Sequence, residues 1–258
     1  MQVVLRSVYS PFSGLSTGKY AKIPIASSPF LCYNGINTNR KGRDFLKAPI
    51  QENLTDKAYA QIKEMILSGQ VKPGDLISIS HMAETLQISR TPITAACQKL
   101  EYEKFLTVIP KQGVIINTIS LETAREIYEL RAAIESYNAK RALDHITAAD
   151  MDLLAASIET QCSHIASGDH LAFMKEDTFF HRYILKKYSN YAFLSTVDTL
   201  YDRAFLLGMR NTSPARLQET IAEHRKILAA LQSGNKQAFA DAIEENILNG
   251  YRNLTNNL

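Results

Sequence analysis

The sequence predicts a mainly α-helical protein in which three short helices and a β-hairpin precede an all-α antiparallel bundle of about six helices. Three observations carry this prediction. Apolar residues recur at helical spacing in three segments that begin near Leu54. Two β-rich runs, 105–109 and 114–117, follow them and are joined by a turn that contains Pro and Gly. From Leu121 onward only helical periodicity is found.

The chain is long enough for two domains, and its first segment differs from the rest. The 258 residues can form two separate cores. Residues 1–50 are rich in Ser, Gly, Pro and Asn and show no sustained period, so we expect a poorly ordered tail. The first domain is expected at 51–118 and the all-α domain at 120–256.

Cellular location and redox class follow from what the sequence lacks. No apolar run is long enough to span a bilayer, and residues 1–20 lack the continuous apolar core of a secretory signal. We therefore expect a cytoplasmic protein without a membrane partner. The three cysteines, Cys32, Cys97 and Cys162, are far apart, which predicts neither a disulfide framework nor a thiolate zinc site.

The first domain shows helix start and stop signals in the order of a winged helix-turn-helix. Gly69 can end the first helix, and Ser78 can cap the second. Ser89 can cap the third helix, where Pro92 is tolerated because the first turn leaves its backbone N–H groups without partners.

The second domain is expected to begin with a helix that Ser120 can cap. Further helices are expected near 148–167, 170–188, 191–209, 214–233 and 236–254.

In a winged helix-turn-helix the second helix of the pair enters the major groove, and its N-terminal residues reach base edges and phosphates. The hairpin tip can approach the adjacent minor groove, where a glycine would let the backbone come close. Acidic and basic residues balance in 51–119, so charge alone does not identify a DNA-binding segment. The expected DNA contacts are Ser89, Arg90, Thr91, Thr94, Lys111, Gln112 and Gly113.

The helical domain contains an acidic residue and a histidine at helical spacing. Asp177 and His181 are four residues apart and would lie on one face of a helix. His224 lies on a later helix, directly after Glu223. Imidazoles and a carboxylate that converge inside a bundle are a usual way to hold a divalent transition metal. Taken alone, this spacing is more often a surface ion pair.

Residues 54–117 resemble the DNA-binding domain of the GntR family. The sequence departs from the usual pattern at Thr94 and Gln112, where the family usually has arginine, so the operator is expected to differ or to be bound more weakly. The resemblance rests on Ile66, Gly69, Pro73-Gly74, Leu76, Ala83, Leu86, Ser89-Arg90-Thr91-Pro92, Leu100 and the wing glycine Gly113.

Residues 121–256 resemble the FCD-type ligand-binding domain of the FadR-like GntR regulators. The resemblance implies metal ligation by Asp177, His181 and His224, with Asn246 at the position of the family's third histidine. The metal would be of the zinc, nickel or manganese type. The motifs that match are Arg131-x-x-x-Glu135, Asp177-x-x-Phe180-His181, Asn190, Glu223-His224 and Ala240-x-x-x-Glu244.

The resemblance also implies a small organic acid as effector, and Arg131 and Arg203 are the expected contacts to it. We interpret the chain as a non-enzymatic, homodimeric transcription regulator that binds a pseudo-palindromic operator in double-stranded DNA. Two alternatives are a metal-dependent hydrolase with an accessory winged-helix module and a non-enzymatic adaptor that binds other proteins. The sequence contains no nucleophile motif and no glycine-rich phosphate loop.

Overall fold

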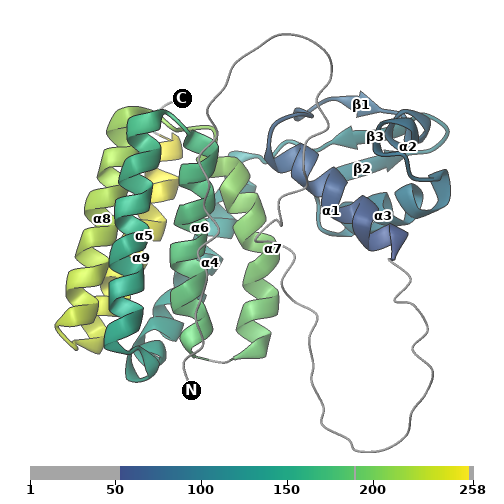
Figure 1. Cartoon of the computed structure of the whole chain (residues 1–258). Coiled ribbons are helices and arrows are strands. Elements are labelled where there is room, and N and C mark those ends of the chain that lie inside the picture. Colours follow the sequence, from purple (N-terminus) through teal and green to yellow (C-terminus); the bar gives the residue numbers. More distant parts are fainter. Residues whose placement is uncertain (1–52, 189, 256–258) are drawn as a thin grey trace, which may run out of the picture. The chain divides into compact units, whose positions relative to one another are not determined.

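The computed structural model describes residues 53–188 and 190–255 (Figure 1). The described residues form nine α-helices, one short 3-10 helix and one three-stranded sheet. This confirms the predicted fold class. The tail expected at 1–50 lies outside the described residues. Among the described helices, none has the length and apolar character needed to cross a bilayer.

The N-terminal region combines three helices with the sheet. Strand β3 is central and pairs antiparallel with both β1 and β2. The sequence did not predict β1, because a two-residue strand is too short to show a periodic pattern. The elements are α1 (Leu54–Leu67), β1 (Leu76–Ile77), α2 (Ile79–Leu86), α3 (Arg90–Tyr102), β2 (Leu106–Ile109) and β3 (Gly113–Ile116).

Local side chains set the ends of these helices. Asn53 accepts a hydrogen bond from the Thr55 backbone N–H at the start of α1, and Ser78 accepts one from the His81 N–H at the start of α2. Ser89 occupies the N-cap position of α3, but its side chain makes no cap hydrogen bond. The inner face of α3, which packs against α1, is fully buried at Ile93, Ala96, Cys97 and Leu100.

Six long helices follow, and their bounds lie within about one residue of the expected ones. Helix α4 packs against α6, α7 and α9 and therefore lies at the centre of the bundle. The helices, visible in Figure 1, are α4 (Leu121–Ala142), α5 (Ala148–Ser167), α6 (His170–Lys187), α7 (Tyr191–Gly208), α8 (Pro214–Gln232) and α9 (Lys236–Thr255), with a 3-10 turn at Leu143–His145.

Start and stop signals define these helices as well. Thr147 and Asp150 form a reciprocal capping box at the start of α5, and Gly168 ends that helix in the left-handed conformation. Ser213 caps α8, where Pro214 occupies the first turn.

The interior of the bundle contains many polar residues, which is unusual for a helical core. The buried polar residues include Arg131, Glu135, Asn138, Gln161, Thr178, His181, Thr220, His224 and Asn246.

Candidate functional site

The leading end of α3 is exposed. Ser89, Arg90, Thr91 and Thr94 are all solvent-accessible, and the Thr94 hydroxyl donates a hydrogen bond of 2.9 Å to the Arg90 carbonyl. The first backbone N–H groups of a helix have no intrahelical partners and favour an anion such as phosphate. This end of α3 is thus accessible to a DNA backbone.

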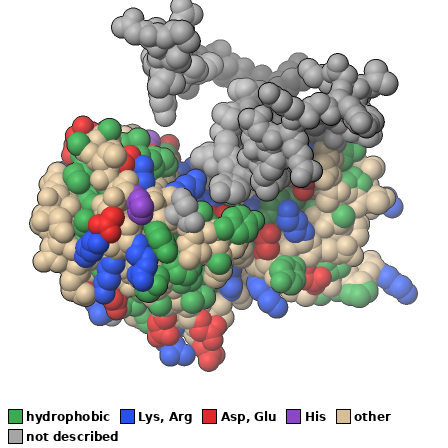
Figure 2. All heavy atoms as spheres, turned by 90° about the horizontal axis from the view of Figure 1, so that it is seen from below, with side chains coloured by type: hydrophobic (Ala, Val, Ile, Leu, Met, Phe, Trp, Pro, Cys, Tyr) green, Lys and Arg blue, Asp and Glu red, His purple; other side chains and the backbone are tan. Residues whose placement is uncertain are grey.

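The hairpin turn between β2 and β3 presents two further polar side chains. Lys111 and Gln112 are both exposed, and Lys111 has a left-handed backbone with φ 66°. On the face that Figure 2 shows, basic side chains of the described residues project in several separate places. The two turn residues therefore contribute one exposed positive charge and one exposed amide.

Gly113 was expected to approach DNA, but the structure gives it another role. It is buried at the start of β3, and its φ is 139°. A Cβ atom added there would lie 2.2 Å from the carbonyl oxygen of Ile77 and 2.8 Å from Cα of Ser78. The glycine is needed because β1 passes so close to β3. This close approach explains a glycine at the position without any contact to DNA.

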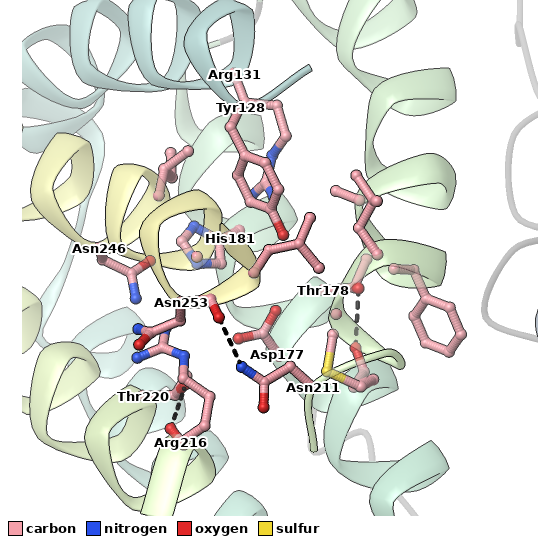
Figure 3. Close-up of a pocket in the computed structure, with 18 of the residues that line it drawn as sticks. Tyr128, Arg131, Asp177, Thr178, His181, Asn211, Arg216, Thr220, Asn246 and Asn253 are labelled. Atoms are coloured by element: carbon pink, nitrogen blue, oxygen red, sulfur yellow. Dashed lines mark hydrogen bonds between the residues drawn. The ribbon is translucent and has the colours of Figure 1, made fainter. Parts of the chain in front are cut away.

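Inside the bundle, side chains from five helices line a polar pocket (Figure 3). Asp177 and His181 project into it from α6, and Asn246 projects into it from α9. The other polar lining residues are Tyr128, Arg131, Thr178, Tyr201, Asn211, Arg216, Thr220 and Asn253.

Asp177, His181 and His224 converge at this pocket. One candidate ligand atom from each of them lies within 4.8 Å of the others. Nε2 of His224 is 3.4 Å from Oδ1 of Asp177, and it is buried without a hydrogen-bond partner among the described residues. An orphaned buried imidazole nitrogen needs an explanation, and a metal ion is one that fits the donor set.

Both histidines are oriented through their other ring nitrogen. Nδ1 of His181 lies 3.1 Å from Oε2 of Glu135, and Nδ1 of His224 lies 2.8 Å from Oε1 of Gln161. Because both partner oxygens accept hydrogen bonds, the two Nδ1 atoms carry the protons. Each Nε2 then offers its lone pair to the cluster, which is the usual arrangement around histidines that bind metals.

The ring of His224 is further held by Phe180. The two rings are stacked with their centroids 4.3 Å apart and an interplanar angle of 14°. Burial, together with the positive charges of His181 in its protonated form and of Arg216, holds the pKa of His224 well below its usual value. His224 is therefore neutral near pH 7, which is the protonation state a metal ligand requires.

Electrostatics keep the supporting carboxylate ionised. Burial opposes the charged form of Glu135, but the charge of Arg131 and the hydrogen bond from His181 outweigh it and lower its pKa to about 2. Burial raises the pKa of Asp177. A bound cation would offset this effect, since it favours the deprotonated carboxylate. The three residues and their partners thus fit a divalent transition metal.

Two arginines line the pocket. Nε of Arg131 is 2.8 Å from Oε1 of Glu135, and its guanidinium lies 4.7 Å from the ring centroid of Tyr201. Arg216 makes a two-pronged pair with Glu223, with both N···O distances 3.1 Å. Fixed guanidinium groups beside a cation site suit a ligand that carries a carboxylate.

Arg203, which the sequence suggested as an effector contact, is not among the residues that line the pocket. It lies on α7, where partial burial lowers its pKa and its Nε is buried without a hydrogen-bond partner among the described residues. Arg216 of α8 lines the pocket. The spacing of Arg216, Glu219 and Glu223 along one helix is the sequence signal for an arginine held by ion pairs on that face.

Comparisons with known proteins agree with both halves of this architecture. Residues 54–116 match the family model for bacterial regulatory proteins of the gntR family. Residues 126–249 match the model for the FCD domain. The two matched segments contain α1 to β3 and most of the helical bundle, respectively.

Similar whole proteins show the same combination. An uncharacterized HTH-type transcriptional regulator, YdhC of Bacillus subtilis, is 25% identical over 70% of this chain and 81% of its own length. The HTH-type transcriptional regulator McbR of Escherichia coli is 24% identical over 76% of this chain and 91% of its own length.

Solved structures of such regulators share the fold. E. coli McbR/YncC has a TM-score of 0.70 at 22% identity and covers 79% of this chain and 98% of its own. A GntR regulator from Rhodococcus has a TM-score of 0.68 at 17% identity, with the same coverage. With both family models matched in the expected order, the chain belongs to the GntR family of bacterial regulatory proteins and carries an FCD domain.

Proposed function

We propose that this GntR-family regulator binds an operator in double-stranded DNA with α3 and the hairpin turn, and that a small organic acid bound in the FCD pocket controls its affinity. The observation that carries the proposal is the combination of an exposed α3 start with a buried, prearranged Asp177, His181 and His224 cluster. The first offers a surface for DNA, and the second offers a site for a controlling ligand.

DNA contact would begin at α3. Arg90 and Thr91 stand at the helix start, where the unpaired backbone N–H groups favour phosphate. Ser89, Thr94, Lys111 and Gln112 complete the proposed surface. Because operators of two-fold symmetry match two-fold proteins, we propose a homodimer on a pseudo-palindromic site.

The effector would bind between the cation site and the arginines. A metal on Asp177, His181 and His224 supplies positive charge with positions open to a ligand oxygen. Arg131 and Arg216 line the same pocket and can hold a second acidic group. A carboxylate ligand is favoured because a bound cation adds positive charge to a pocket in which Arg131 and Arg216 are already paired with Glu135 and Glu223.

A chain of contacts leads from this pocket to α3. Arg131 lies over the ring of Tyr201, and the next residue on α7, Asp202, forms an ion pair of 2.6 Å with Lys63 of α1. Lys63 also lies 3.0 Å from the carboxylate of Glu103, the C-cap of α3. A ligand that shifts Arg131 would act on α1 and α3 through these charged groups.

The test uses the full chain and operator fragments selected from random double-stranded DNA. The expected result is sequence-selective binding, which Arg90→Ala weakens with a salt-dependence slope reduced by about 0.9 if Arg90 contacts one phosphate. Arg125→Ala is the matched control, because Arg125 is an exposed arginine of α4, outside the proposed DNA surface. Absence of selective DNA binding, or equal losses from both variants, would reject the proposal.

The proposed control of operator affinity by a ligand is tested by a separate measurement. Divalent metal together with a panel of di- and tricarboxylates should change operator affinity in the parent chain. Removing two cluster ligands, in His181→Ala with His224→Ala, should abolish this response while binding in the absence of ligand remains. Metal-stimulated hydrolysis without any DNA binding would instead support the hydrolase alternative.

A further inference from the structure

Asn246 occupies the pocket position where the family pattern has a third histidine. It is buried on α9 and lines the pocket together with Asp177 and His181. In Figure 3 its amide lies between the His181 ring and the Arg216 guanidinium. An amide can present either a carbonyl oxygen or an NH₂ group to the cluster, and only the oxygen can bind a cation.

The neighbouring carboxylate decides which end of the amide faces the cluster. Nδ2 of Asn246 donates a hydrogen bond of 2.8 Å to Oε2 of Glu223. An ionised carboxylate only accepts hydrogen bonds, so the amide atom that faces it must be nitrogen. The carbonyl oxygen Oδ1, attached to the same carbon, therefore points away from Glu223.

Glu223 is itself held in place by three donor groups besides Asn246. Arg216 donates to both of its oxygens at 3.1 Å, and Nδ2 of Asn249 donates to Oε1 at 3.0 Å. The carboxylate is thus immobilised and fully paired with donors. Such charge-assisted pairs fix geometry as well as contributing energy.

We propose that Asn246 is the fourth protein ligand of the metal, through Oδ1, and that Glu223 is the residue that positions its amide. The site then has two imidazole nitrogens and two oxygens in place of the three nitrogens and one oxygen that a third histidine would give. This inference rests on the proposed function, because it concerns the same pocket.

The donor set has a consequence for metal preference. Imidazole favours zinc, nickel and copper, whereas carboxylate and carbonyl oxygens suit manganese and magnesium. Exchanging one imidazole for an amide oxygen lowers the advantage of zinc over manganese. The ratio of zinc affinity to manganese affinity should therefore be smaller for this pocket than for a site with three histidines.

The experiment titrates the metal-free full chain with Co²⁺ and Mn²⁺ and records the visible Co²⁺ spectrum, which reports the ligands directly. Asn246→Leu should weaken binding of both ions by about tenfold or more and change the Co²⁺ bands. Asn249→Leu is the matched control: Asn249 donates to the same carboxylate but does not line the pocket. It should leave affinity within about twofold and the spectrum unchanged.

Two further variants test selectivity and positioning. Asn246→His should raise the ratio of zinc to manganese affinity by about tenfold or more. Glu223→Gln should lower Mn²⁺ affinity in the parent chain by about tenfold, yet have little effect once Asn246 is leucine, because no amide remains to be oriented. A merely structural role of Glu223 would give equal losses in both backgrounds.

The metal titrations distinguish a failure of this inference from a failure of the proposed metal site. Parent-like Co²⁺ spectra and affinities in Asn246→Leu overturn the inference while the three-ligand site of the proposed function stands. If the parent chain binds no divalent metal, this inference fails together with the metal site of the proposed function, whereas operator binding is decided by its own test. Thermal unfolding is measured for each variant, and Asn246→Ala replaces Asn246→Leu should the leucine variant not fold.

Discussion

Oε2 of Glu135 lies 3.1 Å from Nδ1 of His181, so a residue of α4 orients a residue of α6. The other oxygen of the same carboxylate, Oε1, is 2.8 Å from Nε of Arg131. Glu135 therefore neutralises a buried arginine and fixes the ring of a candidate metal ligand at the same time. This double contact ties the stability of the bundle to the geometry of the pocket.

Glu135→Leu should destabilise the protein by about 3–5 kcal/mol, because it leaves the buried charge of Arg131 without its partner. Urea unfolding measures the loss. The double variant Arg131→Met, Glu135→Leu should be more stable than Glu135→Leu alone, since an apolar replacement removes both charges. A double variant less stable than the single one would contradict this account.

Gly113→Ala should be strongly destabilising. The added methyl group would meet the Ile77 carbonyl at 2.2 Å, and φ at this position is 139°. Because the obstacle is backbone, the strands must separate. Gly69→Ala provides the comparison: its φ is 74°, but nothing lies within 4 Å of the added Cβ. It should cost only about 1–2 kcal/mol, from the left-handed backbone alone.

Thermal unfolding of the two glycine variants is the measurement. We expect a markedly larger fall in melting temperature for Gly113→Ala than for Gly69→Ala. Equal shifts would show that the close approach of β1 to β3 contributes nothing beyond backbone conformation.

Lys63→Met should reduce the effect of ligand on DNA affinity. The variant breaks the buried ion pair with Asp202 on the path from the pocket to α3. Lys175→Met is a matched control, because Lys175 pairs with Glu64 of α1 at 3.0 Å but both side chains are more exposed. Exposed pairs contribute about 0–1 kcal/mol, so this control should retain the ligand response.

The readout is the ratio of operator affinities with and without the metal and acid. In Lys63→Met the ratio should approach one, while Lys175→Met keeps the parent value. An unchanged ratio in both variants would exclude this ion pair as the route of coupling.

Asp150 should make folding sensitive to acid. Its hydrogen bonds from Lys187, from the Thr147 backbone N–H and from Tyr183 hold its pKa well below the ordinary value of 3.8. A lowered pKa contributes stability above that ordinary value, and the contribution is lost as pH falls below it. Urea midpoints of the parent and of Asp150→Asn should therefore differ near pH 7 and converge in strong acid. A pH-independent difference would contradict the prediction.

Much of the fold could be predicted from short-range signals. Thr147 and Asp150 cap α5 within one helical turn, and Pro214 marks the start of α8 in the same way. Such signals depend on neighbours a few residues away, and so the helix bounds in the bundle were predictable to within about one residue. Asp177 and His181 share a helix face for the same reason.

The sequence by itself therefore determined the order of the helices and of the β-hairpin and the Asp177 to His181 spacing. Only the tertiary structure decided which groups support the histidines: Glu135 is 46 residues from His181, and Gln161 is 63 residues from His224. It also placed Gly113 against β1 and brought Arg216 rather than Arg203 into the pocket. Helical periodicity places a side chain on a face, but the partner of that face depends on how separate helices pack, which no local pattern specifies.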